Sequence, residues 1–586
     1  MRIILGVADA LNRLHGWAAS RRNLILSLAG ICLLSSLPLF AYGDIVGHDY
    51  GYHVMRIEGL AKELWNGVFP VRISSAFFKG RGYPSSIYYN DIFLYPAALL
   101  RMAGLSMSYA YKCYVLMINA VTAWVSYLCF LGIFRSRKVA LLTALAYTTA
   151  SYRLVDIYVR SAVGEYTALT FLPVVALAVH RIYGELATAR AQREATALLA
   201  VGMSGLIGSH ILSVEMAVLT LLVVVLALWR RTFAPRRLLV LFTAAAITLL
   251  LNLYFIVPFL DYYMNVSVRI NATMNRVPKI QAVGARFPEL FAFFNEPFGY
   301  GHMGAGGKRL MLTTGLVLMA ACVGAVVLWV NDRLRRRGRI KFLTVLSVLM
   351  LWMASSAFPW NFLAAHSRLG ALLAQVQFPW RYLGIAEIFQ VLLLGELLLM
   401  AGRYPRVRSR AAELYGWTAA LCVIMTIFFM TTLVNGSHLN YSYKVNSYAV
   451  GGAEYLRKGT DFKTLRRRFY SRNAKYLKVI AQNGTQIDVR CGVGDEPAYL
   501  EAPLLNYKGY HVTDDDGNEY EIFDGENNLI AFHLPPNFQG VLHIRFVEPW
   551  YWRLSEVVSL LTFIIICVWA WRSLRPRLGL SSSDGV

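Results

Sequence analysis

The chain has 586 residues, of which 57% are hydrophobic and 16% are charged, and its formal net charge is +24. A soluble protein of this length has about 25% charged residues, so the composition excludes an ordinary soluble enzyme and indicates a polytopic membrane protein. The basic residues lie in short loops between apolar spans rather than in a stripe with interleaved aromatic residues. This pattern argues against a nucleic-acid-binding protein.

Apolar segments long enough to cross a bilayer follow one another along the chain. The first, residues 23–42, follows a basic flank, which places the N-terminus in the cytoplasm. The interval 88–104 contains Asn90 and Pro96, so we interpret it as a surface helix rather than a span. The other spans are expected at 107–134, 138–153, 163–183, 195–210, 211–229, 237–259, 309–330, 342–357, 380–401, 412–433 and 553–572. With about twelve spans, every strongly basic loop and both termini fall on the cytoplasmic side.

The first outer loop, residues 43–106, is unusually polar for this chain. Asp44, Asp49, His53 and Arg56 follow one another closely in it. Asp49 and His53 have i,i+4 spacing, so on a helix they share a face. The apolar residues after His53 recur at helical spacing, which predicts an amphipathic helix on the membrane surface. A solvated loop after a membrane anchor is the alternative.

Residues 435–549 have a different pattern, with short alternating runs separated by turn residues. The dipeptide Asn483-Gly484 lies between two such runs and predicts a β-hairpin. We therefore expect a membrane domain at 1–434, an extracytoplasmic antiparallel β-domain at 435–549, and a last span with a cytoplasmic tail at 550–586.

Further ionisable residues gather at the predicted outer ends of the spans, where charges usually mark a site or a structural bridge. One cluster contains Tyr152, Asp156, Arg160 and Glu165, and Asp156 and Arg160 have the spacing of a helical ion pair. A structural salt bridge is the alternative. His210 lies between two closely coupled spans, where a buried histidine with satisfied hydrogen bonds is the alternative to a functional one.

Two other outer segments carry cations. Arg381, in the motif QFPWRYL, lies where the positive-inside rule predicts no cation, so it suits an anionic group such as a lipid phosphate. Snorkelling to headgroups is the alternative. Lys308 ends the glycine-rich segment GYGHMGAGGK, which is interpreted either as a plain flexible loop or as a cover over a phosphate or sugar.

Several of these motifs resemble known membrane proteins. The first span with its acidic outer loop, followed by GYPSSIYYNDIFLYP, resembles the GT-C class of membrane glycosyltransferases. The segments YRLVDIYVRSAVGEYTALTFLPVV, GSHILS and QFPWRYL are similar to the bacterial family labelled "6-pyruvoyl-tetrahydropterin synthase-related" and to its YfhO-like relatives. The resemblance covers most of the membrane region and the β-domain.

The resemblance implies a GT-C-like fold and transfer of a sugar from a polyprenyl-phosphate donor to a polysaccharide, lipid or protein of the bacterial envelope. The reaction would take place on the outer face of the cytoplasmic membrane. Asp49 matches the acidic residue that serves as base or binds acceptor or metal, with Asp44 second and His53 supporting it. The use of a divalent metal stays open. The substrate-binding candidates are Arg56, Tyr152, Asp156, Arg160, Glu165, His210, Lys308 and Arg381.

Two other functions remain as alternatives. A transporter or flippase of lipid-linked sugars needs polar residues along a path through the bilayer, whereas the charges here gather at the outer ends of the spans. A non-catalytic scaffold for envelope assembly would use the β-domain as its binding surface. Turnover of lipid-linked sugars by the purified protein distinguishes the three.

Overall fold

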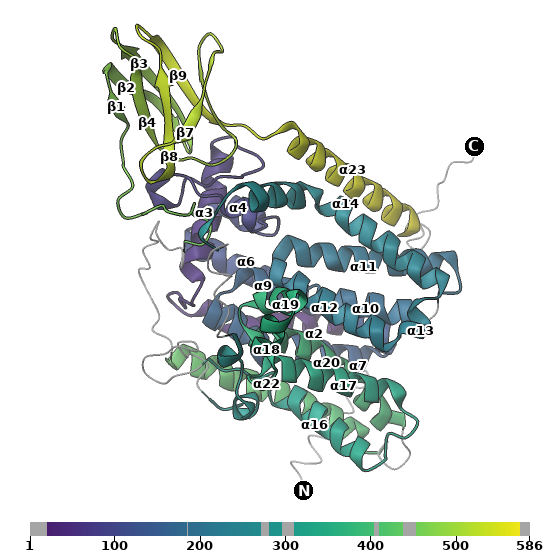
Figure 1. Ribbon diagram of the computed structural model, residues 1–586. Coiled ribbons are helices and arrows are strands. Elements are labelled where there is room, and N and C mark those ends of the chain that lie inside the picture. Colours follow the sequence, from purple (N-terminus) through teal and green to yellow (C-terminus); the bar gives the residue numbers. More distant parts are fainter. Residues whose placement is uncertain are drawn as a thin grey trace, which may run out of the picture. The chain divides into compact units, whose positions relative to one another are not determined.

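The computed structural model describes residues 20–184, 186–270, 280–295, 310–403, 409–436 and 453–574. Most of these residues form α-helices, and two antiparallel sheets lie toward the C-terminal end of the chain (Figure 1). The prediction of an α-helical membrane protein with a small β-domain is thereby confirmed.

The chain divides into two compact units. The first unit comprises Met1–Val54, Ala103–Val240 and Met274–Val445, and the second comprises Met55–Met102, Leu241–Thr273 and Asn446–Val586. The predicted domain boundaries at 434 and 549 stay a prediction.

The first unit is helical. Its main helices are α2 (Arg21–Ser36), α6 (Met107–Phe134), α7 (Arg137–Thr148), α8 (Ser151–Val155), α9 (Val163–Leu169), α10 (Leu172–Tyr183), α11 (Ala189–Ser209), α12 (Ile211–Ala227), α13 (Trp229–Thr232), α16 (Leu316–Val330), α17 (Gly338–Ala354), α18 (Trp360–His366), α19 (Arg368–Leu373), α20 (Tyr382–Arg403) and α22 (Ala411–Gly436). The chain passes between the units within α3 (Tyr50–Trp65) and α14 (Pro235–Asn265).

Among the described residues, 7 helical segments are long and apolar enough to cross a membrane. They are Arg21–Phe40, Met107–Phe134, Val163–Tyr183, Pro235–Asn265, Pro379–Arg403, Ala411–Gly436 and Trp550–Arg572. Each coincides with an expected span, and α12 and α16 are shorter apolar helices at two further expected positions. In the interval 88–104, α5 (Tyr95–Met102) has 8 residues, which is too short to span a bilayer of about 30 Å.

The second unit contains the two sheets. One has the strand order β1-β4-β8-β7 and the other β2-β3-β9-β5-β6. The strands are β1 (Tyr470–Arg472), β2 (Ala474–Asn483), β3 (Gln486–Val493), β4 (Ala498–Leu505), β5 (Tyr510–Asp514), β6 (Glu519–Tyr520), β7 (Ile522–Asp524), β8 (Leu529–Leu534) and β9 (Gln539–Phe546). The predicted hairpin is confirmed, because Asn483 pairs with Gln486 and Gly484 has a φ of 60°.

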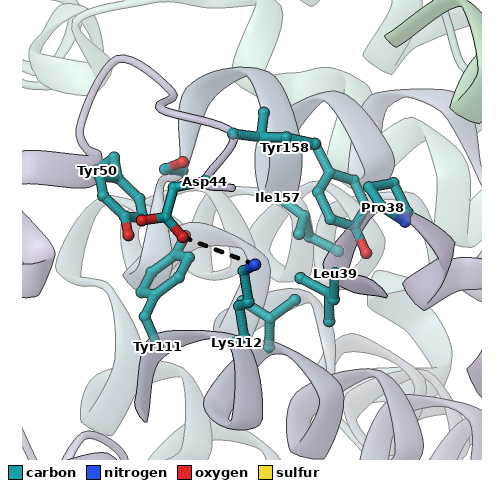
Figure 2. Close-up of a pocket in the computed structure, with 11 residues that line it drawn as sticks. Pro38, Leu39, Asp44, Tyr50, Tyr111, Lys112, Ile157 and Tyr158 are labelled. Atoms are coloured by element: carbon teal, nitrogen blue, oxygen red, sulfur yellow. Dashed lines mark ion pairs between the residues drawn. The ribbon is translucent and has the colours of Figure 1, made fainter. Parts of the chain in front are cut away.

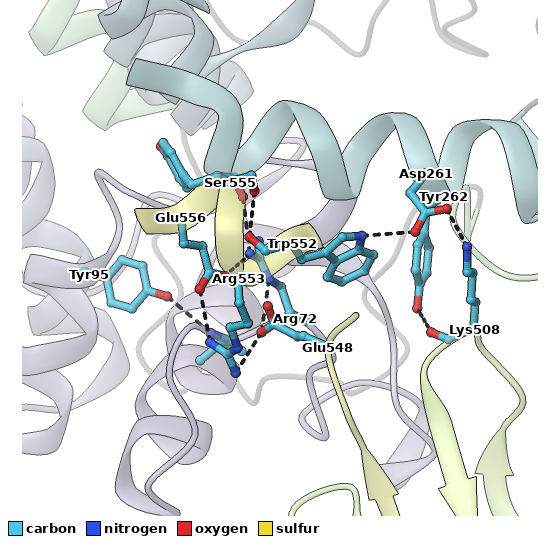
Figure 3. Close-up of polar contacts among 12 residues, drawn as sticks. Arg72, Tyr95, Asp261, Tyr262, Lys508, Glu548, Trp552, Arg553, Ser555 and Glu556 are labelled. Atoms are coloured by element: carbon cyan, nitrogen blue, oxygen red, sulfur yellow. Dashed lines mark hydrogen bonds and ion pairs between the residues drawn. The ribbon is translucent and has the colours of Figure 1, made fainter. Parts of the chain in front are cut away.

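Within the second unit, polar contacts tie the sheets to α14 and α23 (Trp550–Leu574) (Figure 3). The Asp261 carboxylate accepts hydrogen bonds from Lys508 Nζ at 2.6 Å, Tyr551 at 2.6 Å and the Trp552 indole at 3.0 Å. Buried polar groups need such partners, so one carboxylate joins two membrane helices to the loop before β5.

A second tie in the same unit involves a buried guanidinium. Arg72 Nη2 donates to Glu556 at 2.6 Å, and its Nε lies 3.4 Å from Glu548 (Figure 3). Two carboxylates therefore share one buried cation beside the start of α23.

Candidate functional site

The site of the first unit is built on a backbone pairing between two segments far apart in the sequence. His48 N–H donates to the Val159 carbonyl at 3.1 Å, and Asp49 N–H donates to the Arg160 carbonyl at 2.8 Å. Gly47 makes this close approach feasible, because a Cβ there would lie 2.8 Å from the Val159 carbonyl oxygen. The pairing places the candidate base directly beside the candidate phosphate-binding segment.

The second segment contains a π-helical turn, Asp156–Arg160, between α8 and α9. It ends at Ser161, whose backbone is left-handed (φ 53°, ψ 36°) and whose N–H donates to the Asp156 carbonyl. The predicted ion pair between Asp156 and Arg160 is present. Single π-helical turns are frequent at functional sites, because the extra residue redirects side chains.

Two arginines from distant segments meet on one carboxylate. Glu165 Oε2 lies 2.7 Å from Arg160 Nη1 and 3.1 Å from Arg381 Nε. Tyr152 donates to the other oxygen of Glu165, and the guanidinium of Arg160 lies 4.5 Å from the centre of the Trp380 ring. All of these side chains are buried, so the cluster is a compact, strongly paired group with little exposure to water.

Arg381 makes further contacts within its own segment. Its Nη1 donates to the Val376 carbonyl and to the Gln377 side chain, each at 3.1 Å. The guanidinium therefore points toward the protein interior rather than snorkelling along the chain to headgroups.

Asp49 differs from the other carboxylates of the site because its side chain is accessible to solvent. The surrounding protein nevertheless removes enough water to raise the pKa of its carboxyl, while the charges of Arg160 and Arg381 oppose this shift. Burial and the neighbouring Glu165 also raise the pKa of Asp156. Asp49 thus combines access for a substrate with the raised basicity that a general base needs.

Asp44 lies in a separate, small cavity of about 20 Å³, which has room for roughly one water molecule (Figure 2). It accepts a hydrogen bond from Ser108 and lies 3.8 Å from Lys112 Nζ, which also donates to the carbonyls of Ala41 and Gly43. Figure 2 shows Tyr50 and Tyr111 beside this carboxylate. Because Ser108 and Lys112 already contact the Asp44 carboxylate, Asp44 is a weaker candidate base than Asp49.

The two candidate histidines are both buried. His53 donates its backbone N–H to the Asp49 carbonyl at 3.1 Å, one helical turn on, as the spacing predicts. His210 separates α11 from α12, and its Nδ1 lies 2.9 Å from the Ser213 hydroxyl.

The remaining candidates lie elsewhere. Arg56 belongs to the second unit, where it is 2% exposed and its Nε donates to Asp91 at 3.0 Å. It also stacks over the Tyr89 ring at 4.0 Å. Lys308 lies outside the described residues. In the part of the chain that the structure describes, no three His, Cys, Asp or Glu side chains converge as metal ligands.

Sequence reasoning missed several members of the site. Trp380 lies within the motif that pointed to Arg381, but nothing in the motif indicates that its ring faces Arg160. Glu387 accepts the Tyr152 N–H at 3.0 Å, a contact between residues far apart in the chain. Gly47 carries a weaker signal, because glycine is the residue that permits a close backbone approach.

No protein-family model and no curated protein matches the sequence, so the resemblance to YfhO-like proteins is not confirmed. Among solved structures, ArnT from Cupriavidus metallidurans bound to undecaprenyl phosphate is 13% identical, with a TM-score of 0.38 over 71% of this chain and 77% of that chain. The Archaeoglobus fulgidus oligosaccharyltransferase in complex with zinc and sulfate is 14% identical, with a TM-score of 0.40 over 71% of this chain and 54% of that chain. Its apo form has a TM-score of 0.36 at 13% identity, over 72% of this chain and 57% of that chain. Likenesses at these scores are too weak to carry a function, so the proposal below rests on the site residues.

Proposed function

We propose that this protein is a GT-C-class glycosyltransferase of the bacterial cytoplasmic membrane. It transfers a sugar from a polyprenyl-phosphate donor to a polysaccharide, lipid or protein acceptor on the outer face. The observation that carries the proposal is the meeting of a solvent-accessible carboxylate, Asp49, with two buried arginines, Arg160 and Arg381, that share Glu165.

The chemistry of sugar transfer needs both kinds of group. The acceptor hydroxyl attacks the anomeric carbon, and its proton passes to the Asp49 carboxylate as the new C–O bond forms. The bond from the anomeric carbon to the phosphate oxygen breaks, and polyprenyl phosphate leaves with additional negative charge. Arg160 and Arg381 stabilise this charge, since guanidinium groups pair well with phosphate oxygens.

Glu165 has a defined role in this scheme. Before the donor binds, Glu165 supplies negative charge to both buried arginines, and Asp156 supplies it to Arg160 as well. A donor phosphate then competes with Glu165 for Arg160 and Arg381.

The rest of the proposal follows from the topology. Both termini lie in the cytoplasm, the β-domain lies outside, and the segment with Asp49 faces the outer side, as the positive-inside pattern predicts. The partners are the lipid-linked donor, the envelope acceptor and the bilayer itself. Neither the sugar nor the need for a metal is specified.

A donor panel tests the proposal directly. Purified protein in nanodiscs is incubated with polyprenyl-phosphate sugars that differ in the sugar, together with envelope fractions as acceptors, and the products are analysed by mass spectrometry. Release of polyprenyl phosphate together with a glycosylated acceptor is expected for at least one donor. Translocation of intact donors across proteoliposomes without bond cleavage would instead establish the flippase.

A further inference from the structure

A polar cavity of about 380 Å³ lies at the opposite end of the span Val163–Tyr183 from Glu165. It forms where α6 and α10 end and α11 begins, all within the first unit. Its size fits a phosphate-containing headgroup better than a single water or ion. The proposed transferase reaction uses none of its residues.

The cavity is strongly cationic. Arg135 and Arg181 line it together with His180, and the described lining residues include no acidic side chain. Arg181 Nε is buried and has no hydrogen-bond partner among the described residues. Buried N–H groups are usually hydrogen-bonded, so this unsatisfied donor favours a bound acceptor in the cavity.

The start of α11 adds to this positive field. Thr188 lines the cavity and caps the helix, its hydroxyl accepting the Ala191 N–H at 3.1 Å. The first turn of a helix carries N–H groups without intrahelical partners, and the helix dipole is positive there. Anions bind readily at such a terminus when cationic side chains face it.

Arg135 occupies a backbone position that favours glycine. It caps the C-terminus of α6 in the left-handed region, with φ 54° and ψ 27°, and its N–H donates to the Leu131 carbonyl. A side chain is unfavourable at this position. The chain therefore tolerates local strain to keep a guanidinium in the cavity, and such strain often accompanies function.

We propose that this cavity binds the phosphodiester headgroup of an anionic phospholipid, held by Arg135, Arg181 and the first turn of α11. The predicted topology places this end of the span on the cytoplasmic side, where anionic lipids attract basic sites near the membrane. The two guanidiniums hold the phosphate oxygens by charge-assisted hydrogen bonds. This lipid site does not depend on the proposed transferase activity.

Native mass spectrometry of the full-length protein tests the proposal, with phosphatidylglycerol, cardiolipin and phosphatidylcholine as probes. Arg135→Gly is the sharpest variant, because glycine suits the left-handed backbone and so should fold at least as well. Arg135→Gly and Arg181→Gln should each weaken phosphatidylglycerol binding about tenfold or more, as expected for a lost charge-assisted contact. Arg335→Gln is the control, since Arg335 is exposed and does not line the cavity.

The three probes and the control give distinct results. Selective retention of anionic lipid by the wild type and by Arg335→Gln, with loss in Arg135→Gly, supports the site. Equal binding of phosphatidylglycerol by wild type and both cavity variants overturns it. Thermal stabilisation by inorganic phosphate, with no selective retention of anionic lipid, also overturns it in favour of a soluble ligand.

Discussion

Asp49 donates its backbone N–H to the carbonyl oxygen of Arg160 at 2.8 Å, so the candidate base and the candidate phosphate clamp are fixed to each other through the main chain. A side-chain change at either residue should therefore leave this geometry intact. Conservative substitutions at Asp49 and Arg160 should therefore report on the chemistry of the side chains rather than on a change in their positions.

Asp49→Asn should keep the shape of the site and remove the proton acceptor. We expect sugar transfer to fall by about 10²–10⁴-fold, the usual range for loss of a general base, with donor binding almost unchanged. Asp44→Asn is the matched control, because Asp44 is already held by Ser108 and Lys112 and should cost far less activity. A purified Asp49→Asn protein that transfers sugar at close to the wild-type rate removes Asp49 from the mechanism.

Arg160→Gln and Arg381→Gln test the phosphate clamp. Each should weaken donor binding by about 1.5–3 kcal/mol, the worth of a hydrogen bond to a charged group. Arg339→Gln, which breaks a half-exposed pair with Glu396 at 3.0 Å, should leave donor binding unchanged. Donor titrations and thermal denaturation of the same variants distinguish a phosphate clamp from a structural salt bridge. Lost stability with normal donor binding would show that the arginines only bridge to Glu165.

Gly47→Ala should separate the two paired segments. The added methyl would lie 2.4 Å from the Ser161 hydroxyl and 2.8 Å from the Val159 carbonyl oxygen, so backbone must move. Overpacking of this kind costs about 1–3 kcal/mol of stability, and transfer activity should fall with it. Gly30→Ala is the control, because nothing lies within 4 Å of a Cβ at that position in α2. Wild-type activity and melting temperature in Gly47→Ala would show that the close approach is not needed.

Asp261→Ala should destabilise the second unit strongly. It removes the acceptor for Lys508, Tyr551 and Trp552 at once, and the buried Trp552 indole would then lack a partner. We expect a loss of about 2–4 kcal/mol in the free energy of unfolding. Lys508→Ala, which removes a 40% exposed cation, should cost only about 0–1 kcal/mol by thermal denaturation in detergent. Equal losses in both variants would contradict this ranking.

Stability should depend on pH through Glu548. Burial raises the pKa of this carboxyl from its ordinary value of 4.5 to about 7. The folded protein therefore holds a proton that the unfolded chain releases, and the resulting stability is fully present below pH 4.5 and lost as the pH rises through about 7. Melting temperatures measured from pH 5 to pH 8 should fall in the wild type and change less in Glu548→Gln. Parallel curves for the two proteins would show that another group dominates.

Features that depend on local sequence could be predicted. Hydropathy located the helices because a membrane span needs a continuous apolar run, and Asn483-Gly484 located a hairpin because its backbone conformation is rare elsewhere. The pairing of Asp156 with Arg160 followed from helical spacing.

Features that depend on distant parts of the chain could not be predicted. Glu165 binds Arg381, and Arg56 binds Asp91, but no local pattern specifies which carboxylate a buried arginine reaches. The role of Arg56 in substrate binding stays a prediction, and the structure adds that its buried guanidinium pairs with Asp91. The topology of the outer face and the roles of the site residues remain predictions for the same reason.

The π-helical turn Asp156–Arg160 should make this part of the chain sensitive to the deletion of a single residue. A turn of this kind holds one residue more than an α-helical turn, so deleting Ile157 would let the segment close as an ordinary α-helical turn and would bring Asp156 and Arg160 one residue closer in sequence. Most loops of a membrane protein accept a deletion of one residue, but this helix should not. In a deletion scan of residues 150–170, we expect a sharp minimum in activity within the turn, even where the protein still reaches the membrane.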